Sequence, residues 1–221
     1  MVRFSCVTAL VLGFVLSSIL GCSSPGDSRS AAATKSMTSL RDEIAKSQKQ
    51  IEATVTSLQE LGQSGGADLR PKFDKFAANL TAQDKHAAYV KGVAEDMRAK
   101  GRKYFQTWEQ EQEQEKANSP EVQKRIEGRR SELNALYKTI EDSAQTAKAG
   151  YVPFVTSMRD VRTLLKNDLN PSGVAAARDL IEKATQEGAE VNKQLEKLIA
   201  ALDNVARALS PTPVPASNAS E

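Results

Sequence analysis

The chain has 221 residues, of which 5% are aromatic and 26% are charged, and its formal net charge is +2. This near-neutral balance gives no electrostatic basis for nucleic acid as a partner. The two cysteines, Cys6 and Cys22, both lie close to the N-terminus, which excludes a disulfide framework or a cysteine metal site in the rest of the chain.

The first residues have the layout of an export signal. Arg3 precedes an apolar run of about 17 residues, which is short for a helix that spans a bilayer. The run ends in Gly21 followed by Cys22, and a small residue directly before a cysteine resembles a bacterial lipobox. The resemblance implies cleavage between Gly21 and Cys22 and acylation of Cys22 with long chains such as palmitate. An uncleaved membrane helix is the alternative.

The residue after the cysteine bears on location. Ser23 stands there instead of an aspartate, and by resemblance to Gram-negative sorting this favours the periplasmic face of the outer membrane over the inner membrane. We therefore expect residues 1–21 to be a lipoprotein signal peptide and the membrane to be a partner through acylated Cys22. Residues 22–35 begin with small polar side chains and predict a flexible tether.

Residues 36–209 predict an all-α fold of four helices. The strongest evidence is residues 171–209, where apolar or small residues recur at alternating spacings of three and four, the heptad seam of a helix that packs lengthwise against others. The seam is Val174, Ala177, Ile181, Ala184, Gly188, Val191, Leu195, Leu198, Leu202, Val205 and Leu209. Similar seams predict helices over residues 32–61, 68–117 and 120–168. The second of these seams includes Leu80, Val90 and Ala94, and the third includes Val122, Ile126 and Arg129. We expect Pro153 to kink the third helix without ending it.

Local signals mark the helix ends. Gly62 predicts a left-handed end to the first helix, and Ser119 and Asn170 each precede a proline, which is typical of an N-cap before the first helical residue. Because the later connections are short, neighbouring helices should run antiparallel as an elongated four-helix bundle or coiled coil. Residues 210–221 contain three prolines and predict a disordered tail.

No group of residues predicts catalysis. His86 is the only histidine, and its place between seam positions predicts exposure instead of a metal or acid–base site. Trp108 should pack near one end of the bundle. The acidic run 109–115 and the basic run 124–130 should face each other across a hairpin as ion pairs, with a cation site beside a phosphate site as the alternative. We expect no enzyme, no catalytic residue, no cofactor and no metal.

Several short motifs occur in a distinctive order. They are Gly66-Ala67-Asp68-Leu69, Phe105-Gln106-Thr107-Trp108-Glu109, Val152-Pro153 before Met158-Arg159-Asp160, and Leu164-Leu165-Lys166-Asn167-Asp168-Leu169-Asn170. Together they resemble a family of bacterial envelope lipoproteins catalogued as domain of unknown function 2959. The resemblance covers most of the mature chain and implies an architecture and a location, but no activity and no catalytic residues.

Two functions fit these features. The leading hypothesis is a lipid-anchored envelope protein that acts as a spacer or binds an unidentified envelope protein. The alternative is a periplasmic carrier of an apolar ligand or lipid, because small or polar residues interrupt the seams, and a cavity opens if the helices stay apart there. These residues are Gln83, Ala87, Ala94, Gly101, Ala144, Ala147, Ala184 and Gly188. A homo-oligomer is a further alternative, because a second copy can cover a heptad seam.

Overall fold

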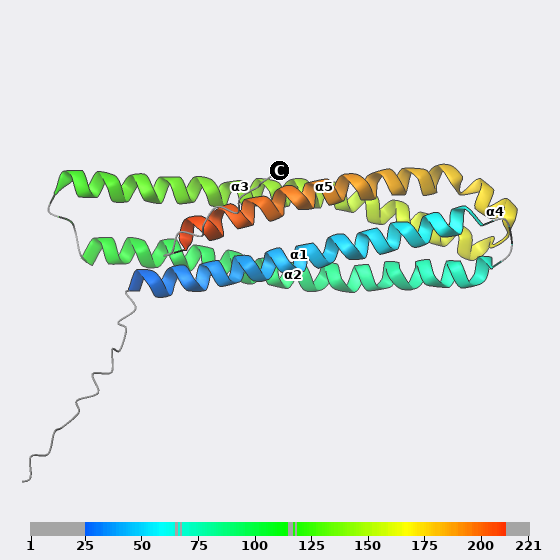
Figure 1. Ribbon diagram of the computed structural model, residues 1–221, viewed down its shortest axis with the longest axis horizontal. Coiled ribbons are helices and arrows are strands. Elements are labelled where there is room, and N and C mark those ends of the chain that lie inside the picture. The colour runs from blue at the N-terminus through cyan, green and yellow to red at the C-terminus, as the bar shows by residue number, and fades with distance from the viewer. Residues whose placement is uncertain (1–24, 65, 67, 115–116, 118, 211–221) are drawn as a thin grey trace, which may run out of the picture.

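The described part of the chain is entirely helical apart from its turns. The computed structural model describes residues 25–64, 66, 68–114, 117 and 119–210, and no strand occurs among them. The helices are α1 (Pro25–Gly62), α2 (Leu69–Gln114), α3 (Pro120–Asn167), α4 (Pro171–Ala176) and α5 (Arg178–Leu209). The predicted all-α class is confirmed, and Figure 1 shows that the long helices run along one elongated bundle.

The first helix begins earlier than predicted. α1 starts at Pro25, so the assignment of residues 22–35 to a tether is wrong for residues 25–35. Ala33 is buried in the core, and Pro25 occupies the first helical position, where a missing N–H costs no helical hydrogen bond. The helix therefore extends to within three residues of Cys22, which lies outside the described residues.

The last predicted helix, residues 171–209, is divided in two. Ala177 separates α4 from α5 and has φ −84° and ψ −4°, which distorts one turn without reversing the chain direction. Asn170 caps α4 as predicted, because its side-chain oxygen accepts a hydrogen bond of 2.9 Å from the Gly173 N–H. A Cβ atom on Gly173 would lie 2.0 Å from the Asp168 carbonyl oxygen, so this turn requires glycine.

The other predicted helix ends are partly wrong. Among the described residues, positive φ occurs at Gly66 and Asp68 and not at Gly62, because the Gln63 N–H still donates a helical hydrogen bond to Gln59. Ser119 has the extended backbone of an N-cap, but its side chain makes no capping hydrogen bond. The third helix continues through Pro153.

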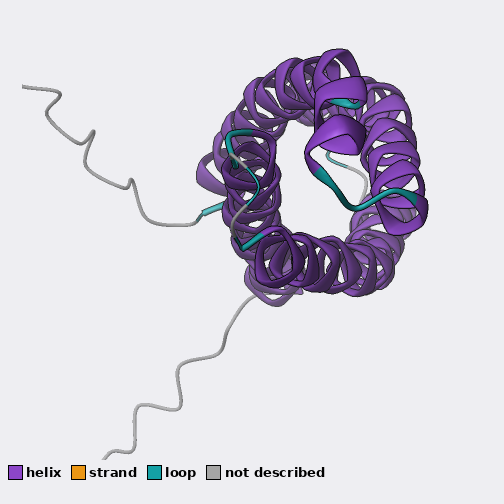
Figure 2. Cartoon of the chain, turned by 90° about the vertical axis from the view of Figure 1, so that its right-hand side faces the viewer, coloured by secondary structure: helices purple, strands orange, loops and turns teal. Residues whose placement is uncertain are grey.

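The four long helices pack in the order α2, α1, α5, α3. Contacts are extensive between α1 and α2, between α1 and α5 and between α3 and α5, whereas α2 and α3 contact each other sparsely. Ion pairs such as Lys75–Glu60 and Arg41–Asp203 link antiparallel segments of neighbouring helices. Figure 2, which looks along the bundle, shows the helices arranged around a common axis. The expected close packing of the second and third helices is therefore wrong over most of their length.

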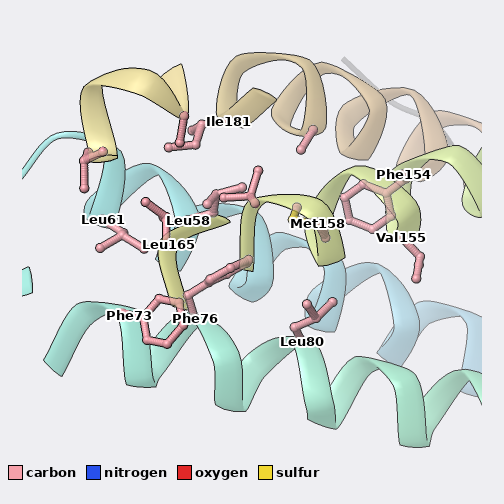
Figure 3. Close-up of a cluster of buried hydrophobic side chains, with 14 of the residues drawn as sticks. Leu58, Leu61, Phe73, Phe76, Leu80, Phe154, Val155, Met158, Leu165 and Ile181 are labelled. Atoms are coloured by element: carbon pink, nitrogen blue, oxygen red, sulfur yellow. The ribbon is translucent and has the colours of Figure 1, made fainter. Parts of the chain in front are cut away.

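The buried side chains form two clusters, one toward each end of the bundle. The first contains Phe76, Phe154 and Met158, with partners from α1, α4 and α5 (Figure 3). The second contains residues of α1, α2, α3 and α5, among them Leu133 and Leu202. Leu195 packs against both clusters and is half-buried, whereas the ten other predicted seam residues of 171–209 are buried. The seam that predicted this helix is confirmed.

Candidate functional site

The sequence-predicted site residues fall in different places. Gly21 and Cys22 lie outside the described residues, so the cleavage and lipidation predictions stay predictions. His86 is half-buried, and its Nε2 lies 3.1 Å from the Glu43 carbonyl oxygen, so the predicted exposure of His86 is wrong. Within the described ranges, no three His, Cys, Asp or Glu side chains lie together as a metal site would require.

Trp108 helps to hold the beginning of α1. The Arg29 guanidinium lies 5.1 Å from the ring centre of Tyr104 and 5.3 Å from that of Trp108, and it forms an ion pair with Glu111. Cation–π contacts of this kind stabilise a cation that is partly removed from water. Packing near one end of the bundle was predicted for Trp108, but Arg29 was missed because it fell within the predicted tether.

The acidic and basic runs face each other across a cavity, as predicted, but few of the predicted ion pairs form between them. Among the described residues of the two runs, one ion pair joins α2 to α3, between Glu109 and Arg130 at 3.5 Å. Glu111 pairs with Arg29 of α1, and Arg125 pairs with Glu121 of its own helix. A cavity of about 470 Å³ separates the two runs, since α2 and α3 stand apart at this end of the bundle.

An apolar groove runs between α2 and α3 near the middle of the bundle. Its volume is about 440 Å³, within the range of small-ligand sites. Apolar side chains of α1 and α5 line it: Leu40, Ile44, Ile51, Leu195 and Leu198. Small side chains of α2 and α3 line it as well: Ala87, Ala94, Ala144 and Ala147. Alanines supply little apolar area to draw two helices together, which explains why the helices stay apart here.

A second cavity of about 280 Å³ continues the groove along the bundle. It shares Leu40, Ala94, Arg98 and Ala144 with the first cavity and extends to Tyr137. Because the two cavities share lining residues from α1, α2 and α3, they form one elongated groove. The groove lies where the two core clusters are joined through Leu195.

Two tyrosines of α3 bridge to α2 at either end of the groove. A Cβ atom on Gly101 would lie 2.6 Å from Cε1 of Tyr137, so the absence of a side chain at Gly101 makes room for this ring. At the other end, the Tyr151 hydroxyl accepts a hydrogen bond of 3.4 Å from Gln83 Nε2. Tyr137 and Tyr151 are two heptads apart, which is about 21 Å along a helix.

The bridging tyrosines are neutral. Burial raises the pKa of the Tyr137 hydroxyl, with a smaller contribution from Tyr104, and burial also raises the pKa of Tyr151. Gln83 is 3% exposed, and its Oε1 has no hydrogen-bond partner. It borders a cavity of about 20 Å³, which is large enough for one water molecule.

The sequence identified much of this groove. Six of the eight residues that interrupt the seams line or border it, namely Gln83, Ala87, Ala94, Gly101, Ala144 and Ala147. Ala184 and Gly188 do not, because both are buried in the first core cluster or against it. The bridging role of Tyr137 was missed, although two tyrosines separated by two heptads beside small seam residues were a usable signal.

A comparison with known protein families identifies the family of this chain. No helix among the described residues is long and apolar enough to cross a bilayer. No curated protein and no solved structure matches the chain. The family described as Protein of unknown function (DUF2959) matches residues 26–209, a range that includes the whole groove and all but the first residue of α1. The chain belongs to this family of proteins of unknown function, DUF2959.

Proposed function

We propose that the protein binds a linear apolar chain, such as an acyl chain, in the groove between α2 and α3. The observation that carries this proposal is the separation of the two helices over alanine seam positions, which leaves the apolar side chains of α1 and α5 accessible. An elongated groove with small residues along its sides fits a thin, extended ligand. Its action is carriage or sequestration without chemistry.

Burying the chain of such a ligand would supply enough free energy for binding. Each buried methylene contributes about 0.8 kcal/mol, so a chain that buries a dozen of them gains about 10 kcal/mol before the cost of association. The groove-lining side chains of α1 and α5 are apolar except Ser47, whose hydroxyl donates a hydrogen bond of 3.1 Å to the Glu43 carbonyl oxygen and so keeps a partner beside an apolar ligand.

The groove can be tested by filling it. Ala94 and Ala144 each line both cavities. Because a leucine at either position would fill part of the groove, we expect Ala94→Leu and Ala144→Leu each to weaken the binding of a fluorescent fatty-acid analogue about tenfold. The protein for this measurement runs from residue 22 onward and carries Cys22→Ser, so that no acyl chain of its own competes. Helicity by circular dichroism should be unchanged.

Ala88→Leu is the matched control for this measurement. Ala88 belongs to α2 but is exposed and does not line the groove, so binding by this variant should equal that of the parent protein. Undiminished binding by both groove variants would contradict the proposed site. Absence of binding by the parent protein would contradict the function.

We further propose that the protein acts at the periplasmic side of the envelope, anchored by acylated Cys22. The support is the lipobox-like sequence that ends in Gly21 and Cys22. Palmitate supplied to growing cells should label the protein, and Cys22→Ser should abolish the label and release the protein from membranes. A membrane-bound Cys22→Ser protein would contradict the anchor.

A spacer or partner-binding role is the second candidate. The observation that favours it is at the beginning of α3, where the predicted seam residues Val122 and Arg129 are exposed and Ile126 is half-buried. This part of α3 lies at the end of the bundle where α2 also ends (Figure 1), and an envelope protein or a second copy could cover it. A crosslinker at Val122 that recovers the same neighbour reproducibly from intact envelopes would support this role, and recovery of none would count against it.

A further inference from the structure

The rim of the groove carries an excess of positive charge. Seven charged residues line the two cavities: the cations Lys91, Arg98, Arg102, Lys138 and Lys148, and the anions Glu95 and Glu141. Five positive and two negative charges give a formal balance of +3 at the groove, whereas the whole chain carries +2. The rest of the chain therefore has no positive excess, and the cations are concentrated around an apolar interior.

Only some of the cations at this rim form ion pairs. Lys91 lies 3.9 Å from Glu95, and Lys138 lies 3.4 Å from Asp142, so these two cations have partners on their own helices. Arg98, Arg102 and Lys148 have no carboxylate within ion-pair distance in the described part of the chain, and all three are exposed.

Arg98 occupies the central place among these cations. It lines both cavities, and Arg102 follows it by one helical turn on the same helix, while Lys148 lies across the groove on α3. A planar guanidinium can donate two parallel hydrogen bonds to a carboxylate or a phosphate. Glu141 also lines the second cavity, but it does not pair with Arg98.

We propose that the natural ligand is a single-chain anionic amphiphile of the fatty-acid type. Its apolar chain lies in the groove, and Arg98 binds its carboxylate at the rim, with Arg102 and Lys148 adding to the positive potential. This inference rests on the proposed function, because it assigns the head group of the ligand that the groove binds. The single chain follows from the volume of the groove, and the negative charge of the head group follows from the unpaired cations.

Three probes with the same chain and different head groups test the assignment. Palmitic acid, hexadecanol and hexadecylamine are titrated into the protein from residue 22 onward with Cys22→Ser. We expect palmitate to bind about tenfold more tightly than hexadecanol, and hexadecylamine to bind more weakly than either. The advantage of palmitate should shrink as salt is added, because salt screens charges at an exposed rim.

Two neutral substitutions locate the head group. Arg98→Gln should reduce the affinity for palmitate about fivefold and leave the affinity for hexadecanol unchanged. Lys85→Gln is the matched control, because Lys85 is an exposed cation of α2 that does not line the groove, and it should change neither affinity. Both variants should retain the helicity of the parent.

The outcomes separate this inference from the proposed function. Equal affinities for palmitate and hexadecanol would overturn the anionic head group while leaving the groove as an apolar site. The anionic head group would also be overturned if hexadecylamine bound most tightly, or if Arg98→Gln lowered the affinities for palmitate and hexadecanol equally. Binding of none of the three probes would overturn the proposed function itself, and the head-group assignment with it.

Discussion

Replacing Leu202 with aspartate is expected to lower the free energy of unfolding by several kcal/mol. Leu202 is fully buried within the second core cluster, whose members offer no cation to an introduced carboxylate. An ionised carboxylate that loses its hydration without a partner costs several kcal/mol. Since a domain is typically stable by only about 5–15 kcal/mol, Leu202→Asp should unfold at least the end of the bundle that contains this cluster.

Lys197→Asp is the control for Leu202→Asp. Lys197 belongs to the same helix but is exposed, so this substitution should change the free energy of unfolding by less than about 1 kcal/mol. Urea unfolding followed by circular dichroism measures both variants. Similar losses in the two variants would mean that α5 presents a different face to the core.

Replacing Gly188 with leucine should also destabilise the bundle, by about 3 kcal/mol or more. A Cβ atom at Gly188 would lie 2.7 Å from Cγ2 of Val55 and 3.0 Å from Cε2 of Phe154. Val55 is β-branched and stiff at χ1, and Phe154 is fully buried, so neither neighbour yields without a shift of its helix. A leucine would have to separate α5 from α1 and α3.

The same substitution at Gly92 is expected to act in the opposite direction. Nothing lies within 4 Å of a Cβ atom at Gly92, and leucine is a better helix former than glycine by up to about 1 kcal/mol. Gly92→Leu should therefore raise the urea midpoint slightly, whereas Gly188→Leu should lower it. If Gly92→Leu and Gly188→Leu shifted the urea midpoint in the same direction, the close approach of helices at Gly188 would be contradicted.

The sequence predicted which faces are buried better than it predicted which helices meet. The heptad seam of α5 identified the core residues because helical spacing alone places them on one face. Heptad spacing does not state which neighbour covers a face. Ala94 and Val90 were therefore expected to be core positions like Leu80, whereas the structure leaves them half-buried, because α3 packs against α5 instead of α2.

The beginning of α1 could not be predicted for a different reason. Residues 25–35 are mostly small or polar, and such a composition favours a linker when it is considered alone. The contacts that stabilise this segment are distant in sequence, since Arg29 reaches the aromatic rings of Tyr104 and Trp108. Because these contacts join residues far apart in the sequence, they leave no local sequence pattern from which the start of α1 could be predicted.

The sparse contact between α2 and α3 has a consequence for the entry of a ligand. The bundle consists of two helix pairs, α1 with α2 and α3 with α5, and these pairs are joined lengthwise through α1 and α5. The opposite side, between α2 and α3, has no such joint over most of its length, and the groove lies there. Tyr137 and Tyr151 bridge this side at either end of the groove. A bound chain would enter sideways along the length of the rod, with no need to thread in from either end.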